Sequence, residues 1–290
     1  MKAKRKNTAA ARFCQALKKD RQFRAGVIGV IILLLLVVLA PVLTTYNPFE
    51  YGPDSLVGIG EKGHILGTNH MGQDVYSMLV YGIRTSLKVA LISSLISGAL
   101  GIIVGGVAGF FGGKVDLVIS EIINAFLMIP TFFLILVIVA LYGNSIANVM
   151  IVIGITSWPG NAKLMRAQAL SLRERTFVKS AVTMGETKTQ ILCKYILPNG
   201  IFPVIANTTR GMAGAILTEA SLSFLGLGDP NIISWGQMIY AGKGYLVTGW
   251  WVSTFAGIAT ILTVIVFYLL GDGLNHVLNC GETGYLRNAG

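Results

Sequence analysis

Long uncharged apolar runs alternate with polar segments along this chain. The first run covers residues 25–43, which is long enough to cross a bilayer as a helix. A secretory signal peptide is the alternative for this run, but the preceding basic stretch and the run itself are both long for one. Five similar runs follow, so the pattern predicts an all-α integral membrane protein with six transmembrane helices. The expected spans are 25–43, 87–111, 115–141, 145–164, 201–222 and 250–270.

Small residues recur every four positions along the second expected span. This spacing puts them near one face of a helix, where a neighbouring helix can approach closely. We expect close helix packing at this face rather than transport chemistry. The residues are Ser93, Ser97, Gly101, Gly105 and Gly109, with Gly113 just past the end of the span.

The composition agrees with a membrane protein. Hydrophobic residues make up 53% of the chain and charged residues 12%, about half of the roughly 25% found in soluble domains. A soluble fold of this length lacks the charge it needs for its surface, and the apolar content excludes disorder. Three cysteines in 290 residues argue against a disulfide scaffold.

The basic residues gather on one side of the predicted topology. Nine of the 23 Lys and Arg residues lie in residues 1–24, and seven lie between the fourth and fifth spans. Because basic loops stay in the cytoplasm, both termini are expected there. The expected organisation is a basic cytoplasmic segment at 1–24, a transmembrane domain at 25–280 and a cytoplasmic tail at 281–290. This placement accounts for the net charge of +10 without a nucleic-acid partner.

The cytoplasmic segment 171–200 has the pattern of two short helices with a break. Gly185 suits the left-handed residue that ends a helix, and Glu186 favours the N-terminal end of the next one. Apolar residues then recur with helical spacing, as at Ile191 and Tyr195. An exposed helix–Gly–helix with an apolar stripe is suited to docking into a groove of another protein.

This segment resembles the EAA loop of ATP-binding-cassette importer permeases, which reads E-A-A, three residues, G, nine residues, I-x-L-P. Three positions depart from that pattern, because Lys179 replaces Glu, Ser180 replaces the first Ala and Tyr195 replaces Ile. The residues that the resemblance assigns to ATPase coupling are Lys179, Ser180, Ala181, Gly185, Glu186, Ile191, Tyr195, Leu197 and Pro198.

Four further blocks resemble the second, or C-type, permease subunit of the dipeptide/oligopeptide/nickel importer family. Residues 64–74 are similar to its H-x-L-G-T-D-x-x-G-R-D block, with Asn69 for Asp and Gln73 for Arg. The other blocks are E-A-S-L-S-F-L-G-L-G at 219–228, S-W-G at 234–236 and G-D-G-L at 271–274. The residues expected to hold outer-loop structure are His64, Gly67, Gly72, Asp74, Glu219 and Trp235.

The resemblance implies a type I importer permease fold in a bacterial cytoplasmic membrane. Two cytoplasmic ATPase subunits would bind ATP and Mg, and this chain would bind neither. It would form the translocation path with a homologous permease, and an external binding protein would deliver the substrate. Di- or oligopeptides are the expected cargo, with nickel, an opine or a metallophore as alternatives on the same scaffold.

Two other classes of function fit less well. A secondary transporter would couple to ions through membrane acids and would need no loop for docking an ATPase. A membrane enzyme would need a reactive cluster, and no catalytic residues have a motif context. The nearest approach to a phosphate-binding loop, at Gly113 and Lys114, has Ala108 and Val115 at positions that require Gly and Ser or Thr.

The remaining polar residues give weaker hypotheses. Glu121 stands where many family members carry a basic residue, so we expect it to form a charge-swapped pair with Lys179; two independent interfacial charges are the alternative. Asn207 and Arg210 are candidates for the translocation path, although interhelical hydrogen bonding explains them equally well. His64 and His70 lack further ligands, so no metal site is expected.

Overall fold

The computed structural model describes residues 20–286, which form helices and loops and no strand. Most of the basic segment 1–24 and the last residues of the tail 281–290 lie outside this part. The helices are α2 (Arg21–Leu43), α3 (Val75–Phe111), α4 (Gly113–Met128), α5 (Thr131–Tyr142), α6 (Ile146–Thr156), α7 (Trp158–Arg173), α8 (Thr176–Thr183), α9 (Lys188–Ile191), the π-helical turn η1 (Leu192–Ile196), α10 (Leu197–Phe224), α11 (Trp235–Gly242), the 3₁₀ turn η2 (Lys243–Tyr245) and α12 (Trp250–Leu286).

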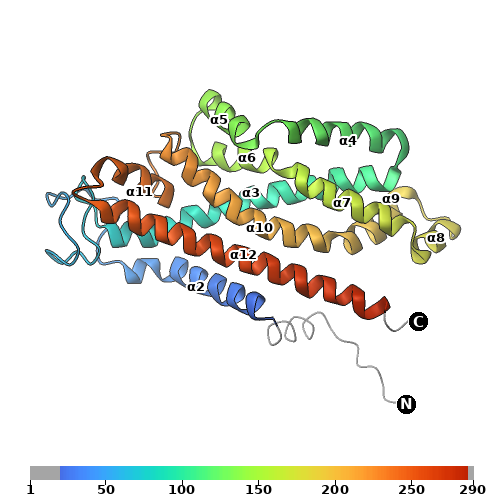
Figure 1. Ribbon diagram of the computed structural model, residues 1–290, viewed down its shortest axis with the longest axis horizontal. Helices are drawn as coiled ribbons and strands as arrows, with labels where there is room; N and C mark the ends of the chain where they lie inside the picture. Colours follow the sequence, from blue (N-terminus) through green and yellow to red (C-terminus); the bar gives the residue numbers. More distant parts are fainter. Residues whose placement is uncertain (1–19, 287–290) are drawn as a thin grey trace, which may run out of the picture.

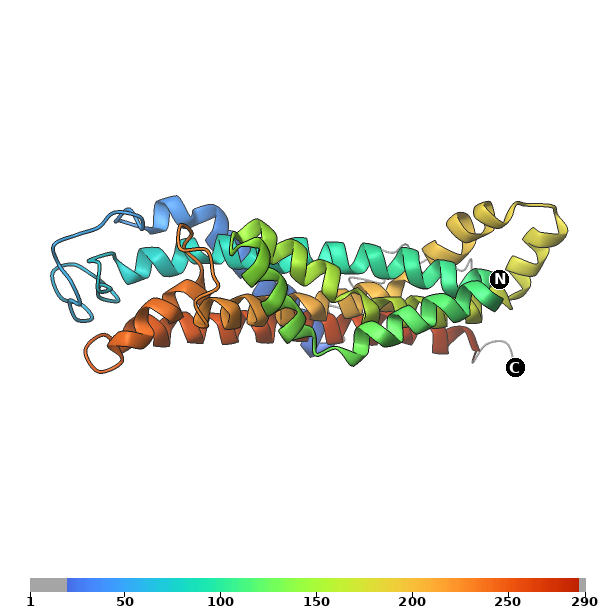
Figure 2. The ribbon, with the colours of Figure 1, turned by 90° about the horizontal axis from the view of Figure 1, so that it is seen from above.

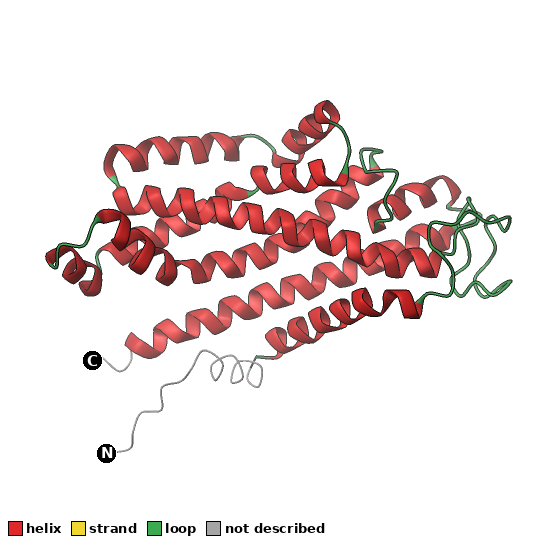
Figure 3. Cartoon of the chain, turned by 180° about the vertical axis from the view of Figure 1, so that it is seen from behind, coloured by secondary structure: helices red, strands yellow, loops and turns green. Residues whose placement is uncertain are grey.

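The helices form an elongated bundle with α3 running along its length (Figure 1). The loop between α2 and α3 gathers at one end beside α11, as the green loops of Figure 3 show. Helices α8 and α9 project from the opposite end (Figure 2). The C-terminal part of α12 runs toward that same end, so the bundle has one loop-rich end and one end formed by short helices.

Three described helices are long and apolar enough to cross a membrane, namely α2, α3 and α12. Helices α4 and α5 together would supply a fourth, but the chain bends by 81° between them. The predicted span 115–141 is therefore bent and is not one continuous helix. The cause is Pro130, which has no N–H and holds Ile129 in an extended conformation (φ −85°, ψ 125°) that ends α4.

The predicted span 145–164 is also divided. Helix α6 ends at Thr156 and α7 begins at Trp158, with Ser157 between them at φ −96° and ψ 0°. Pro159 lies in the first turn of α7, where its missing N–H is tolerated. Two other helices are longer than the predicted spans. Helix α3 starts at Val75 rather than residue 87, and α12 continues to Leu286 rather than ending near residue 270.

The stripe of small residues on α3 packs closely against α7, as its spacing predicted. A Cβ atom built on Gly101 would lie 2.3 Å from Asn161 Cβ, and one on Gly105 would lie 2.2 Å from the Ala162 carbonyl oxygen. The same test at Gly109 gives 2.4 Å to the backbone of α7. Larger side chains would force the two helices apart, so this face fixes α7 against the centre of the bundle.

Candidate functional site

The segment after α7 is a helix–turn–helix that begins with α8. Gly185 has a φ of +81°, which confirms the predicted left-handed residue. The Gly185 N–H donates to the Val182 carbonyl at 3.0 Å, and the Glu186 N–H donates to the Ala181 carbonyl at 3.2 Å. This is the hydrogen-bond pattern of a Schellman motif. The hydrogen bonds of this motif therefore explain why the glycine stands four residues after Ala181.

Glu186 fastens the turn to the next helical segment. Its Oε1 atom accepts the Tyr195 hydroxyl at 2.7 Å and lies 3.3 Å from Lys194 Nζ. The hydrogen bond from Tyr195 is the main cause that holds the pKa of Glu186 below its ordinary value, and Lys194 adds to it. Thr187 rather than Glu186 caps α9, through a reciprocal capping box with Gln190. Glu186 thus acts through side chains and not through the first turn of the helix.

The predicted apolar stripe faces inward rather than toward a partner. Ile191, Leu192 and Ile196 are 2%, 7% and 0% exposed, and they pack with Met165 and Val204 of α7 and α10. The prediction that Ile191 belongs to a docking face is therefore wrong, because the stripe mounts the segment on the bundle. Pro198 lies in the first turn of α10 and is exposed, and Leu197 is half-buried.

A different apolar group is exposed at the tip of the segment. Phe177, Val182 and Met184 are 43%, 60% and 81% exposed, whereas Val178 and Ala181 on the other side of α8 are buried. Helix α8 is therefore amphipathic with its inner face already occupied. We call Phe177, Val182 and Met184 the tip patch. Lys179 and Ser180 are exposed beside it.

The proposed Glu121–Lys179 pair is not formed among the described residues. Lys179 Nζ lies 3.2 Å from Glu174 Oε2, a local pair across the turn between α7 and α8, and Glu121 is exposed on α4. Helices α4 and α7 are instead joined by Asp116 and Arg166. The two N–O distances of this bidentate pair are 2.5 and 2.7 Å. Asp116 lies five residues before Glu121, on a part of α4 that faces α7.

The loop between α2 and α3 is ordered by a buried carboxylate where it joins α3. Asp74 Oδ1 lies 2.9 Å from His64 Nδ1, and both side chains are less than one-tenth exposed. Its other oxygen accepts the Ser77 N–H at 2.8 Å and so caps α3. His70 stacks on Tyr245 with the ring centroids 4.8 Å apart. These contacts give both histidines partners within the protein.

Two glycines of the same loop allow close backbone approach. Gly72 has a φ of +75°, and a Cβ atom there would lie 2.1 Å from the Gly52 carbonyl oxygen. Gly67 has a φ of +76°, and its Cβ atom would lie 2.6 Å from the Val57 carbonyl oxygen. Side chains at either position would break the fold of the loop.

The E-A-S-L-S-F and S-W-G blocks meet in space. Glu219 is 3% exposed and accepts hydroxyl hydrogen bonds from Ser223 at 2.9 Å and Ser234 at 2.8 Å. The buried Trp235 donates from its indole N–H to the Leu79 carbonyl at 3.0 Å. Glu219 and Trp235 therefore join α10, α11 and α3 near the loop-rich end.

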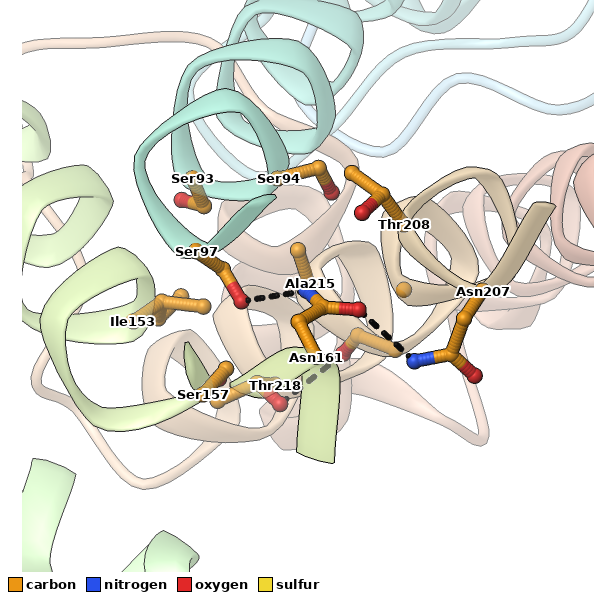
Figure 4. Close-up of a pocket in the computed structure, with 12 residues that line it drawn as sticks. Ser93, Ser94, Ser97, Ile153, Ser157, Asn161, Asn207, Thr208, Ala215 and Thr218 are labelled. Atoms are coloured by element: carbon orange, nitrogen blue, oxygen red, sulfur yellow. Dashed lines mark hydrogen bonds between the residues drawn. The ribbon is translucent and has the colours of Figure 1, made fainter. Parts of the chain in front are cut away.

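The two path candidates lie in different surroundings. Asn207 lines a polar cavity and donates to Asn161 Oδ1 at 2.9 Å, and Asn161 in turn donates to Ser97 Oγ at 3.0 Å (Figure 4). Arg210 is not among the residues lining this cavity, and its Nη1 atom lies 3.4 Å from Asp272 Oδ1 on α12. Gly271, beside Asp272, allows α12 to approach the Arg210 side chain.

The sequence did not single out Asn161 or the Asp116–Arg166 pair. Asn161 comes directly after Pro159 and Gly160 in what read as a span end, and its partners come from α3 and α10. Asp116 and Arg166 are 50 residues apart in the chain. The one sequence feature that pointed toward Asn161 was Gly101 in the small-residue stripe. In the structure, α7 crosses α3 where Asn161 packs against Gly101.

Comparison with known proteins places these features in a family. The family described as binding-protein-dependent transport system inner membrane component matches residues 101–280. The dipeptide transport system permease protein DppC of Alkalihalophilus pseudofirmus is 34% identical over 278 residues, which cover 94% of this chain and 91% of that protein. The probable D,D-dipeptide transport system permease protein DdpC of Escherichia coli is 32% identical, with coverages of 86% and 84%.

A solved structure shares the fold. The inward-facing MetNI methionine ABC transporter contains a chain that matches with a TM-score of 0.55 and 21% sequence identity. The match covers 69% of this chain and 96% of that one. The helical arrangement is therefore the fold of a type I importer permease.

Proposed function

Because this chain belongs to the family of binding-protein-dependent transport system inner membrane components, we propose that it is a permease subunit of an ATP-driven importer of di- or oligopeptides. It is a multi-pass protein of the inner membrane. The peptide cargo is supported by relatives named as dipeptide permeases that align over most of this chain. Nickel, opines and metallophores are the alternative cargoes.

We propose six membrane crossings with both termini in the cytoplasm. The crossings are α2, α3, the bent pair α4–α5, the divided pair α6–α7, α10 and the apolar part of α12. Placing the α8–α9 end in the cytoplasm puts Arg175, Lys179, Lys188 and Lys194 on the basic side. The loop-rich end with His64 and Asp74 then faces outward, where an external binding protein would deliver the cargo.

The tip patch is the observation that supports ATPase coupling. Phe177, Val182 and Met184 are exposed at the far end of a segment that is rigidly mounted through Ile191 and Ile196. An exposed apolar patch on a short helix is the surface that a groove in a partner would cover. Two ATPase subunits would bind ATP and Mg, and a homologous permease would complete the translocation path.

Charge introduced into the tip patch tests this function. We expect Val182→Glu to abolish co-purification of the ATPase subunits and peptide-dependent ATP hydrolysis, since a carboxylate cannot be buried in an apolar groove. Val247→Glu is the matched control for co-purification, because Val247 is 94% exposed at the opposite end of the bundle. If V182E retains the ATPase subunits as wild type does, docking through the tip patch is refuted.

A further inference from the structure

A polar cavity of about 200 Å³ lies between α3, α6, α7 and α10 (Figure 4). Most of its walls are hydroxyl and amide side chains, and none of the described residues lining it is charged. Four of the polar lining residues are more than nine-tenths buried: Ser93, Ser94, Ser97 and Asn161. Such a cavity is unusual in the interior of a helical bundle proposed to cross a membrane, where apolar packing is the ordinary solution.

Two hydroxyls in this cavity have no hydrogen-bond partner. Ser94 Oγ and Thr208 Oγ1 are both buried from solvent and unpaired. They lie on facing helices, since a Cβ atom on Gly98 would be 3.0 Å from Thr208 Oγ1 and one on Gly211 would be 3.9 Å from Ser94 Oγ. Buried hydroxyls left unpaired are costly. The seam between α3 and α10 therefore holds two unpaired hydroxyl donors beside the cavity.

The lining restricts the chemistry of that guest. A charged guest would lose its hydration without gaining an opposite charge, so it is disfavoured. The volume equals that of about seven water molecules at roughly 30 Å³ each, which also fits a small group with an amide. The cavity is bordered by the exposed glycines Gly211 and Gly214, and a Cβ atom on Gly214 would meet nothing within 4 Å. A guest can thus enter past α10.

We infer that this cavity is a binding station for the uncharged amide groups of the cargo, with the Ser94 and Thr208 hydroxyls donating to an amide carbonyl. The inference rests on the proposed function, because a peptide importer is what brings amides to this site. Asn161 would position the cavity wall through Ser97 and Asn207 rather than bind the guest itself. The absence of charge implies that the station recognises peptide backbone and not the charged termini.

Cysteine protection tests the station in the assembled transporter. In a background with Cys14, Cys193 and Cys280 changed to Ser, Ser94→Cys is labelled with a small thiol reagent. The probe is cyclo(Gly-Gly), which has two amides and no charged terminus. We expect labelling to slow about tenfold at a probe concentration near ten times its Kd. The variant that keeps Cys193 as its only cysteine is the control, because Cys193 is exposed and does not line the cavity, so the probe should leave its labelling rate unchanged.

Each other outcome overturns the inference. Labelling of S94C without protection by the probe means that the cavity holds water alone, and no labelling means that it is closed to solutes. A second variant, Ser94→Ala/Thr208→Val, should raise the KM for peptide about tenfold with kcat and ATPase co-purification retained; an unchanged KM counts against the station. Failure of the wild-type transporter to import peptide would refute the proposed function instead, since protection by cyclo(Gly-Gly) requires no transport.

Discussion

At the scale of single residues, Arg84 compensates for a proline in a neighbouring helix. Pro41 lies inside α2 and has no N–H, so the Val37 carbonyl four residues earlier lacks its helical donor. Arg84 of α3 donates to this carbonyl from Nε at 3.1 Å and from Nη2 at 3.0 Å. We predict that Arg84→Met lowers the free energy of unfolding by about 1–3 kcal/mol, measured by thermal denaturation in detergent.

The proline supplies the control for this prediction. Pro41→Ala restores an N–H that can bond to Val37 within α2, so Arg84→Met should cost less in that background. A double-mutant cycle measures the difference. Equal losses with and without Pro41 would show that Arg84 stabilises the protein by some other contact, such as its 5.1 Å approach to the Tyr81 ring.

Asn69 and Gln73 are the two residues of the block 64–74 that depart from the family pattern, and their side chains contact each other. Asn69 Nδ2 donates to Gln73 Oε1 at 2.8 Å, and Gln73 Nε2 donates to the Pro48 carbonyl at 3.0 Å. Both side chains are buried, so a neutral pair occupies the place where the family pattern has Asp and Arg. We predict that Asn69→Asp alone destabilises the protein by about 1–3 kcal/mol, because a buried charge is left unpaired.

The double variant Asn69→Asp/Gln73→Arg should recover most of that loss. Its guanidinium can donate both to the new carboxylate and to the Pro48 carbonyl. Thermal stability of the two single variants and the double variant distinguishes the outcomes. A double variant no more stable than N69D would mean that the two positions are independent.

At the scale of elements, the sequence predicted features that depend on local patterns and missed those that depend on helix orientation. The small-residue stripe and the left-handed Gly185 follow from spacing within one segment, and both were found where expected. The bend at Pro130 was missed because the apolar run continues through it. Hydrophobicity marks which residues prefer lipid, but it does not show whether the helix through them is straight.

The predictions of the Glu121–Lys179 pair and of a docking face at Ile191 failed for a related physical reason. Glu121 and Asp116 both lie on α4, and only the rotation of that helix decides that Asp116 meets Arg166. Similarly, the apolar stripe at Ile191 could equally have faced a partner or the bundle. The same amphipathic pattern serves both roles, so burial by the rest of the chain must be known before a free face can be assigned.

The segment from α8 to η1 itself carries a prediction about pH. The Tyr195 hydroxyl, and after it Lys194, lowers the pKa of Glu186. The ionised Glu186 and its two partners therefore stabilise the segment at pH values above the ordinary Glu pKa. That contribution is lost as the pH falls through the lowered pKa of the folded state. Tyr195→Phe removes the hydroxyl, so the pKa of Glu186 should rise and the segment should loosen at a higher pH than in wild type.

Hydrogen exchange of residues 185–196 across the acid range measures this shift. Tyr142→Phe is the control, because Tyr142 is 75% exposed on α5, away from the segment. The expected result is a loss of protection that begins at higher pH in Y195F alone. Identical pH profiles for Y195F and wild type would exclude the hydroxyl as the cause of the depressed pKa.

At the scale of the whole molecule, α7 connects the two functional regions. Asn161 near its start lies in the wall of the polar cavity, Arg166 in its middle binds Asp116 of α4, and the chain turns into α8 after Arg173. The close packing along α3 prevents α7 from flexing independently of the bundle core. We expect movement of the tip patch to pass through the turn at Glu174 and Arg175 into α7, and so to reach the cavity wall at Asn161.

The Arg166–Asp116 pair should make α4 move together with α7, and so increase the amount of peptide imported per ATP hydrolysed. Arg166→Ala removes a charge-assisted, partly exposed pair worth about 1–3 kcal/mol, so α4 should no longer follow α7. We predict that reconstituted R166A transporter hydrolyses more ATP per peptide imported, by about tenfold for each 1.4 kcal/mol of the pair's free energy that is lost. Asp116→Ala should match it, and the double variant should be no worse, because all three lose the same pair. Lys163→Ala, an exposed change on the same helix, should leave the ratio as in wild type; a wild-type ratio in R166A would show that the pair only holds the fold together.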